Sequence, residues 1–404
     1  MIALGTVDRG VSDAAWKAYL DLATKLTGHA VSESKLRGEG EGVYVEKAPV
    51  SPADPLSVKE VQGFLHDVGF LPFGQRDGIC GYRTTCAIRL FQEYVRTVEK
   101  DDAIGSPDGA LGTKGFEAVA RWQREGKKAD WETGPPDPRY EHGLGLLRKI
   151  RADCEANPSG MLREVNKYSG KTDTVKVAHW DFDPKFIHLI GVRESSAATA
   201  QRLNDVFFLF IRGMVFTFFG STDPGTVAGR AGQERGAPFL ATGQHLYRFG
   251  WHKLTVADRI YQALKPKGNG VLVVRSKKDM HLSQDDIAKG VELNHSINIH
   301  WGGSGFKDSA AWSAGCQVIA GKTYLNHRNE RVDMGDFAAS GYGEIGFDTT
   351  TRTFRNKGAY TVLGDIVAAF SGEDNDVHYT LLTEEELKVS PGVVAMIKAA
   401  KELF

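Results

Sequence analysis

The sequence places a cysteine and a histidine at a spacing that suits attack on an acyl group. Cys316 ends the segment Ser313-Ala314-Gly315-Cys316, and His300 precedes Cys316 by sixteen residues. A cysteine attacks a carbonyl carbon as its thiolate, and a neighbouring imidazole can take the thiol proton. The pair therefore predicts a site for cysteine-dependent acyl transfer.

The residues around His300 have the two-residue period of a β-strand. Ile297 and Ile299 alternate with Asn298 and His300. The two isoleucines are therefore expected on a buried face and His300 on the opposite face, towards a cleft. The alternative interpretation is a buried structural cysteine near a hydrogen-bonded histidine, because free cysteine is among the most buried residue types.

The loop before Cys316 contains the other candidate catalytic groups. Gly315 permits a tight bend of the backbone. The N–H groups of Gly315 and Cys316 are the expected donors to the negatively charged oxygen that forms during acyl transfer. Ser313 is expected to orient the loop or the histidine. The predicted catalytic set is therefore Cys316, His300, Gly315 and Ser313.

This arrangement resembles the signature of the L,D-transpeptidase (YkuD-type) catalytic domain, in which a histidine precedes a Ser-His-Gly-Cys motif. The positions that match are His300, Ser313, Gly315 and Cys316. The resemblance implies a mostly β catalytic fold. It also implies that Cys316 attacks the L,D-amide carbonyl of a peptidoglycan stem peptide to form a thioester, with His300 as the base.

Two positions depart from the family motif. Ala314 stands where the family has histidine, and Gln317 stands where an aliphatic residue is usual. These departures affect the molecule that receives the acyl group from the enzyme more than they affect the nucleophile. Water in place of an amine would make the enzyme an L,D-carboxypeptidase or endopeptidase, and an amine would make it an L,D-transpeptidase.

A second signal is an internal repeat upstream. Asp77-Gly78 and Asp108-Gly109 open two similar turns that lie 31 residues apart, and each turn leads into a segment with helical spacing of apolar residues. Residues 55–126 resemble the helical peptidoglycan-binding domain, whose pattern is a D-G-x-x-G-x-x-T turn and a helix ending in Phe-Gln. The second copy has Gly115 where the first has Thr84.

The resemblance of residues 55–126 implies binding to the bacterial cell wall through a shallow groove. Tyr82, Arg83 and Arg89 are the candidate groove residues. An ordinary small helical bundle is the alternative interpretation. The two resemblances come from different parts of the chain and agree on peptidoglycan, both glycan strands and stem peptides, as the partner.

Composition excludes several other classes of protein. The chain has 404 residues, 41% hydrophobic and 25% charged, with 50 Lys and Arg against 51 Asp and Glu. This balance predicts no nucleic-acid partner and no attraction to an anionic membrane surface. The apolar run 206–219 is interrupted by Arg212 and Gly213, so no membrane span is expected.

The first residues bear on the place of action. Residues 1–20 carry four charged side chains and lack the apolar core of a secretory signal. Action on the wall, in the periplasm or outside the cell, would therefore depend on specialised secretion or on phage lysis. The sequence indicates no particular immunity or delivery partner.

The chain carries no pattern that predicts a cofactor or a metal. It has four cysteines and neither a Cys-x-x-Cys nor a His-Glu-x-x-His motif. Reduced thiols are expected, and whether Cys80 and Cys86 pair stays open.

Four further residues are candidates for binding the substrate: Trp301, Trp312, Gln317 and Arg248. The two tryptophans bracket the nucleophile loop and are expected to wall a peptide groove, although core packing is the alternative for both. Arg248 is expected to bind a carboxylate of the stem peptide.

The fold class predicted is multidomain, α plus mostly β. A small helical peptidoglycan-binding domain is followed by a β-rich L,D-transpeptidase-like catalytic domain and a C-terminal helix. Short apolar segments separated by glycines predict strands at 186–192, 206–219, 270–275, 296–301, 317–320 and 360–362. The expected divisions are 1–50 (helix and linker), 51–130 (peptidoglycan-binding domain), 131–175 (linker with helix), 176–372 (catalytic domain) and 373–404 (helical tail).

The leading hypothesis is a peptidoglycan-targeted cysteine enzyme, either a phage wall enzyme or an antibacterial secreted effector. The alternative is a non-catalytic wall-binding or virion structural protein that keeps the fold without the activity. Ala314 is the residue that favours this alternative.

Overall fold

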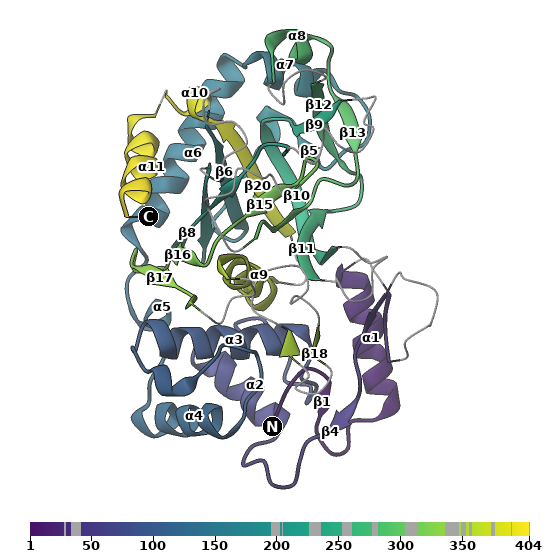
Figure 1. Ribbon diagram of the computed structural model, residues 1–404, viewed down its shortest axis with the longest axis vertical. Helices are drawn as coiled ribbons and strands as arrows, with labels where there is room; N and C mark the ends of the chain where they lie inside the picture. The colour runs from purple at the N-terminus through teal and green to yellow at the C-terminus, as the bar shows by residue number, and fades with distance from the viewer. Residues whose placement is uncertain are drawn as a thin grey trace.

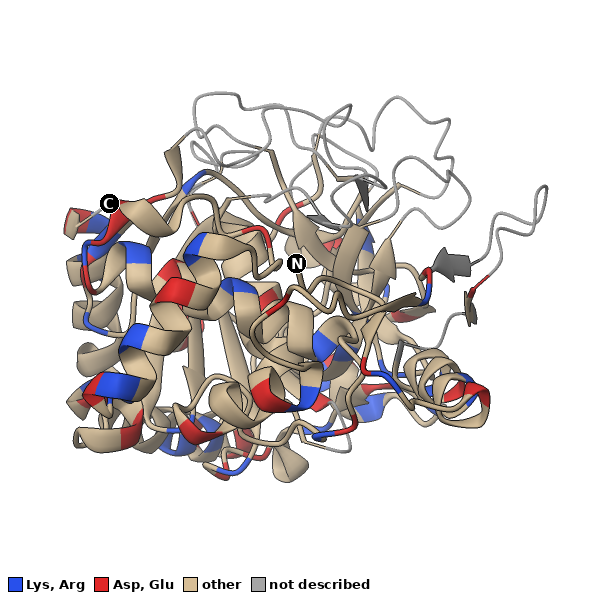
Figure 2. Ribbon diagram, turned by 90° about the horizontal axis from the view of Figure 1, so that it is seen from below, with Lys and Arg blue, Asp and Glu red and all other residues tan. Residues whose placement is uncertain are grey.

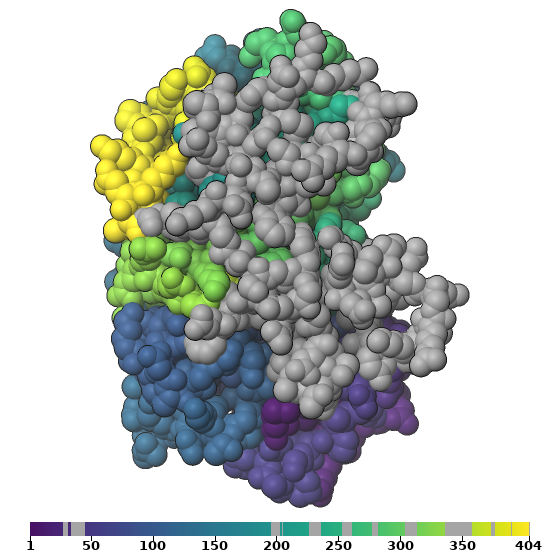
Figure 3. Space-filling model, in the orientation of Figure 1, coloured from purple at the N-terminus to yellow at the C-terminus, as the bar shows by residue number. Residues whose placement is uncertain are grey.

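The chain is a mixed α/β protein in which a helical N-terminal region lies against a sheet-rich C-terminal region (Figure 1). The computed structural model describes residues 1–27, 30–33, 42–194, 203, 205–225, 236–252, 261–276, 282–303, 313–335, 347–348, 353–354, 358–372, 376–388 and 390–403. In Figure 3 the purple and blue N-terminal residues form the lower part of the molecule, and green to yellow C-terminal residues lie above them.

The N-terminal region is built from helices and short strands. Its helices are α1 (Asp13–Thr27), α2 (Val58–Asp67), α3 (Tyr82–Thr97), η1 (Asp102–Ile104), α4 (Thr113–Glu125) and α5 (Asp130–Thr133). Its strands are β1 (Thr6–Val7), β2 (Ala30–Ser32), β3 (Gly42–Tyr44) and β4 (Ala48–Pro49), with β1 paired to β4 and β2 to β3. Strands β3 and β4 therefore lie in the second half of residues 1–50, where the sequence predicts a linker.

A glutamine on the preceding helix holds the first glycine turn of the repeat. Gln62 Nε2 donates to Asp77 Oδ1 at 2.8 Å and to the Ile79 carbonyl at 3.0 Å. The Gly78 N–H donates back to Gln62 Oε1 at 3.0 Å. Gly78 has a φ of +78°, where a side chain would strain the backbone, so glycine is required at this position.

The second turn is held in the same way. Gln92 Nε2 donates to Asp108 Oδ1 at 3.1 Å and to the Ala110 carbonyl at 2.9 Å, and the Gly109 N–H donates to Gln92 Oε1 at 2.9 Å. The repeat seen in the sequence is therefore also a repeat of hydrogen bonds. Gln62 was not singled out in the sequence, although Val61-Gln62 echoes Phe91-Gln92.

The C-terminal region is organised around a sheet that closes on itself. Its strands follow the order β15-β14-β11-β10-β20-β6-β7-β8, and β8 pairs back to β15. The strands are β6 (Ile187–Arg193), β7 (Asp205–Ile211), β8 (Met214–Ser221), β10 (Gly243–His252), β11 (Tyr261–Pro266), β14 (Ile299–Trp301), β15 (Gln317–Ile319) and β20 (Asp376–Thr383). Closure leaves this ring without an open edge.

Smaller strands extend or flank the closed sheet. β16 (Thr323–Leu325) pairs with β8 and with β17 (Arg331–Asp333), and β5 (Thr174–Val175) pairs with β10. A second sheet contains β9 (Ala237–Leu240), β12 (Val271–Ser276) and β13 (Glu292–Asn294), and β18 (Phe347–Asp348) pairs with β19 (Thr353–Phe354).

Alternate residues of the strands belong to two separate cores. Leu189, Phe207 and Tyr379 belong to the core inside the closed sheet. Ile190 and Phe208 point outwards and share a core with α6 (Pro138–Ala156) and α11 (Pro391–Leu403), which cover that side. The remaining helical segments are α7 (Gly160–Lys167), η2 (Val177–His179), α8 (Gln284–Ala288) and α10 (Glu384–Leu387).

One predicted strand is a helix. Residues 360–362 lie in α9 (Ala359–Phe370), all of whose residues are buried. A short apolar run does not by itself distinguish a strand from a buried helix, and this run continues for twelve residues. In Figure 1, α9 lies between the closed sheet and α3, and it contacts both.

The predicted helical tail also contains a strand. β20 pairs with β10 on one side and with β6 on the other, so the sheet extends past residue 372. Two helices follow β20 in the tail. Thr383 and Glu386 form the capping box of α10, and α11 begins at Pro391.

The candidate groove residues of the helical region lie at its junction with the sheet. Arg89 and Asp365 of α9 form a buried ion pair at 3.2 Å. Tyr82 packs edge-on against Trp251 with the ring centroids 4.7 Å apart, and Arg83 donates to the Gly372 carbonyl at 2.7 Å. These side chains therefore hold the two regions together, and the expectation that they line an open groove is corrected.

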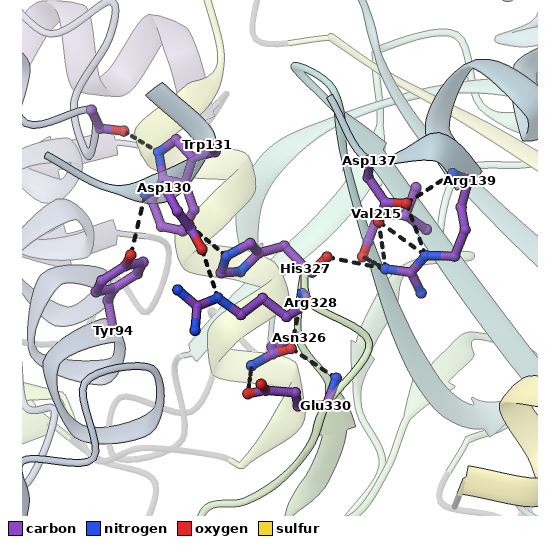
Figure 4. Close-up of polar contacts among 11 residues, drawn as sticks. Tyr94, Asp130, Trp131, Asp137, Arg139, Val215, Asn326, His327, Arg328 and Glu330 are labelled. Atoms are coloured by element: carbon purple, nitrogen blue, oxygen red, sulfur yellow. Dashed lines mark hydrogen bonds and ion pairs between the residues drawn. The ribbon is translucent and has the colours of Figure 1, made fainter. Parts of the chain in front are cut away.

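A second junction joins α5 to the turn between β16 and β17 (Figure 4). His327 Nε2 lies 2.7 Å from Asp130 Oδ1, and Arg328 Nε donates to Asp130 Oδ2 at 2.6 Å. Burial raises the pKa of Asp130, but the hydrogen bonds and charges of His327 and Arg328 outweigh burial and hold the pKa below its usual range.

In the view of Figure 2, Lys and Arg are interspersed with Asp and Glu along the helices. Within the described ranges, no helix is both long enough and apolar enough to cross a membrane.

The repeat predicts a loss of stability on replacing its glutamine. Gln92→Ala removes the partner of the second turn and leaves buried backbone groups without hydrogen bonds. We expect the free energy of unfolding to fall by about 2–3 kcal/mol. Gln123→Ala is the matched control because Gln123 follows Trp122 as Gln92 follows Phe91, yet it is exposed, so a change of less than about 0.5 kcal/mol is expected. Equal losses in denaturant unfolding would contradict the role of Gln92.

The α5 junction predicts a pH-dependent contribution to stability. Asp130→Asn should lower the free energy of unfolding by about 1–3 kcal/mol at pH 7. Because the folded pKa of Asp130 is depressed, this contribution is present above the ordinary aspartate pKa of about 3.9 and is lost as the pH falls below it. The gap between wild type and variant should therefore shrink in acid, whereas Asp21→Asn, at an exposed pair with Lys17, should have little effect at either pH.

Candidate functional site

Cys316 is the one cysteine of the four that is partly exposed. Cys80, Cys86 and Cys154 are buried, and all four are free. The Cys316 thiol donates to the Ser296 carbonyl at 3.3 Å and accepts a hydrogen bond from the Asn298 N–H at 3.3 Å. Cys316 as a residue is therefore partly exposed, and the segment before β14 holds its thiol in place.

The pairing of β14 with β15 puts the candidate residues on one face. The two strands are parallel, with Ile299 opposite Gln317, and both of these side chains are buried inside the closed sheet. Side chains alternate along a strand. Asn298, His300 and Cys316 therefore share the outer face of the sheet. Asn298 and His300 are nevertheless buried on that face, so the expectation that His300 faces an open cleft is not confirmed.

The imidazole of His300 is held by the residue that follows it. His300 Nδ1 lies 2.7 Å from the Trp301 carbonyl and 3.2 Å from the Tyr261 hydroxyl. A carbonyl can only accept, so Nδ1 carries the proton in the neutral ring and Nε2 is the basic nitrogen. This is the tautomer that a general base requires.

A second imidazole stacks on His300. The ring of His252, at the end of β10, lies 4.5 Å from that of His300 at an interplanar angle of 15°. His252 Nδ1 is 2.9 Å from Asn298 Nδ2. Asn298 thus contacts both His252 through its side chain and Cys316 through its backbone.

The structure does not bring His300 and Cys316 into a hydrogen bond. The polar contacts of the thiol are with Ser296 and Asn298, and His300 lies at the next position along the same face of β14. Proton transfer between Cys316 and His300 would require the thiol to leave the Ser296 carbonyl.

The two candidate oxyanion donors converge on one point. The N–H groups of Gly315 and Cys316 both donate to Ser313 Oγ, at 3.2 and 2.6 Å. Gly315 has a φ of +147°, and a Cβ there would lie 2.6 Å from Pro238 Cγ. Glycine is therefore required, and the serine hydroxyl occupies the position that an oxyanion would take.

The thiol of Cys316 has a raised pKa. Burial raises its pKa, and the Asn298 amide, the Ser313 hydroxyl and the charge of Lys265 oppose that effect without cancelling it. A nucleophile at this position therefore depends on a base.

Two of the predicted substrate-binding residues face the inside of the sheet. Trp301 is completely buried in the core. Gln317 is also buried, with its Oε1 accepting from the Tyr379 hydroxyl at 3.0 Å and its Nε2 donating to the Thr222 carbonyl at 3.2 Å. Both residues support the nucleophile loop from within and do not reach the outer face. Trp312 lies outside the described residues.

Arg248 is on the same face as Cys316 and lies opposite Lys265 across β10 and β11. Lys265 and His252 are not among the residues predicted from the sequence; the signal for Lys265 is the lysine that interrupts the apolar strand 261–266. The stacking of His252 on His300 depends on strand pairing, which the sequence around each histidine does not reveal.

No family model matches the chain, and neither the curated proteins nor the solved structures yielded a match. Among the described residues, no group of three His, Cys, Asp or Glu side chains is arranged to hold a metal ion. The possible chemistry of the site therefore has to follow from the residues of this chain.

The site predicts selective and pH-dependent alkylation. Iodoacetamide should label Cys316 alone in the folded protein. The rate should be low at pH 7 and reach half its maximum above the ordinary thiol pKa of about 8.5, because burial raises the pKa of this thiol. Cys154 is the internal control, since burial raises its pKa to about 12. A rate at Cys316 that is already maximal at pH 7, measured by mass spectrometry, would contradict this assignment.

Proposed function

We propose that the protein is a cysteine-dependent acyl-transfer enzyme that acts on L,D-amide bonds of peptidoglycan stem peptides. The observation that carries the proposal is the shared outer face of β14 and β15, with a partly exposed thiol and a histidine held in the basic tautomer. The substrate class comes from the resemblance of residues 300–316 to the L,D-transpeptidase motif.

In the proposed reaction, His300 Nε2 accepts the proton of the Cys316 thiol as the sulfur attacks the amide carbonyl carbon. The Gly315 and Cys316 N–H groups hold the resulting oxyanion once the Ser313 hydroxyl has rotated away from them. The carbon–nitrogen bond breaks, the proton on His300 passes to the leaving amine, and a thioester remains. Water or an acceptor amine then attacks the thioester and releases the thiol.

The absence of a direct contact between the thiol and the imidazole is compatible with this reaction. Catalytic hydrogen bonds are often long in an unliganded site and tighten when substrate binds. Rotation about the Cα–Cβ bond of Cys316 would exchange the Ser296 carbonyl for another partner. The thiol contact with that carbonyl, at 3.3 Å, is a weak one.

Wall binding by the helical region is a separate part of the proposal, based only on the resemblance of residues 55–126. Tyr82, Arg83 and Arg89 are engaged with the sheet-rich region, so a wall-binding surface would have to use other residues. Action on the wall, in the periplasm or outside the cell, follows from the same proposed substrate.

Muropeptide digestion tests the proposed activity. Purified peptidoglycan stem peptides incubated with wild type should lose the residue beyond the L,D-amide or exchange it for an amine, as read by mass spectrometry. Cys316→Ala should abolish the change, and His300→Gln should reduce it by about 10² or more, because the base that ionises the thiol is lost.

Two controls separate activity from stability. Cys154→Ala removes another thiol and should keep the activity, provided that all variants show the same thermal unfolding as wild type. Retention of wild type on sacculi without any change in the muropeptides would favour the non-catalytic wall-binding alternative. Full activity in Cys316→Ala would exclude this cysteine as the nucleophile.

A further inference from the structure

Four polar positions form one row across the outer face of the sheet beside the thiol. Arg248 is opposite Lys265 in the pairing of β10 with β11. Leu264 is opposite Ile299 in the antiparallel pairing of β11 with β14, which brings Lys265 opposite Asn298. The Gln317 N–H donates to the Asn298 carbonyl at 2.9 Å, so Cys316 continues the row on the next strand.

The distance along this row suits a small ligand. Neighbouring strands are about 4.8 Å apart, so the Lys265 backbone lies about 10 Å from that of Cys316. A lysine side chain spans most of that gap. The charges also interact: burial raises the pKa of the Cys316 thiol and the charge of Lys265 opposes that rise, while burial and then the charge of Arg248 lower the pKa of Lys265.

Arg248 carries an unsatisfied donor at the end of the row. Its Nε is buried and has no hydrogen-bond partner. Among the described residues, no carboxylate forms an ion pair with its guanidinium. Arg139, Arg212 and Arg328 differ in this respect, because each has a carboxylate partner.

A second unsatisfied atom lies nearer the thiol. Asn298 Oδ1 is buried without a hydrogen-bond partner, while the Nδ2 of the same side chain contacts His252. Burying a polar group without a partner costs free energy. An acceptor at Asn298 and a donor at Arg248 are therefore unmet groups on the same side of the thiol, Asn298 on the adjacent strand and Arg248 two strands beyond it; the first suits an amide N–H and the second an anion.

We propose that Arg248 and Lys265 bind the free C-terminal carboxylate of the substrate, so that the enzyme removes a single terminal residue from a peptide. This assignment rests on the proposed function and specifies its substrate as a peptide whose scissile amide is the last one. In such a peptide the carboxylate carbon is about 4 Å from the carbonyl carbon that the thiol attacks. With the carbonyl at Cys316, the carboxylate then lies on the Lys265 side of the thiol, towards which a lysine side chain can extend, and Arg248 is one strand further along the row.

The reaction is a balanced hydrolysis. The carbon–sulfur bond forms as the terminal carbon–nitrogen bond breaks, and the thiol proton passes through His300 to the leaving amine. The released product is one amino acid. Water then adds to the thioester, gives its proton to His300 and restores the thiol, leaving a peptide shorter by one residue.

Two peptides that differ only at the terminus test the assignment. One ends in a free carboxylate and the other in a carboxamide, with the same stem-peptide sequence. For wild type we expect kcat/KM to be higher for the acid by about tenfold or more, because a site built for a charged group rejects a partner that lacks it. In Arg248→Ala and in Lys265→Met this ratio should fall towards one.

Lys267→Met is the matched control. Lys267 follows β11, is exposed and pairs with Asp376, so its loss should leave the ratio at the wild-type value. The same fall in the ratio for Lys267→Met would indicate a general effect of surface charge and would overturn the assignment. Equal cleavage of both peptides by wild type would also overturn it while supporting the proposed activity.

Binding to Cys316→Ala keeps the two proposals distinguishable. Calorimetric titration of this variant with both peptides requires no turnover. If wild type cleaves neither peptide, the proposed activity fails, and a tenfold preference in binding the acid that depends on Arg248 still supports the carboxylate site. Equal affinities for acid and carboxamide would overturn it.

Discussion

The close approach of β8 to β15 is the contact on which the candidate site depends. A Cβ at Gly220 would lie 1.8 Å from the Val318 carbonyl oxygen, so only glycine allows the two backbones to meet. That meeting closes the ring of eight strands and holds β15 between β8 and β14. The nucleophile loop ends directly in β15. The position of the Cys316 backbone is therefore set by strand pairing on both sides of Val318, and flexibility of the loop has little influence on it.

The closed sheet also determines how α9 packs against the rest of the structure. The inside is filled by apolar side chains, and α9 lies against β10, β11 and β14. Because every side of α9 is buried, its far face must meet another element, and α3 of the helical region meets it. The buried pair of Arg89 and Asp365 fixes this contact, since either charge alone would be costly in the interior. The helical region is in this way part of the structural support of the sheet.

The elements that the sequence predicted are those whose signals are local. The hairpin of β7 and β8 follows from two apolar runs separated by Arg212-Gly213, both of which have the positive φ of a tight hairpin turn. The capping box at Thr383 and the D-G turns of the repeat are also local patterns. By contrast, the burial of Arg89 and the helical state of α9 depend on partners far away in the chain. A charged residue on an amphipathic helix is usually at the surface. Arg89 is buried instead because it pairs with Asp365 of α9.

The residues of the candidate site also divide into those that local patterns predict and those whose positions depend on distant parts of the chain. The alternation around His300 predicted which face of the strand His300 shares with Cys316, but the residues that contact the thiol, Ser296 and Asn298, were not predicted. Trp301 and Gln317 were misplaced because the inner face cannot be identified without the pairing of β15.

The resting contacts of the site also bear on the proposed chemistry. The thiol and the two loop amides each have a hydrogen bond that the reaction would have to exchange, and neutral hydrogen bonds contribute about 1 kcal/mol each. Exchanging them would cost about 3 kcal/mol, which is small beside the 8 kcal/mol or more (~8–23) by which enzymes lower a barrier. Because the backbone at Gly315 lies close to Pro238, the proposed reaction would rotate only the side chains of Ser313 and Cys316 and would leave the two N–H donors where they are.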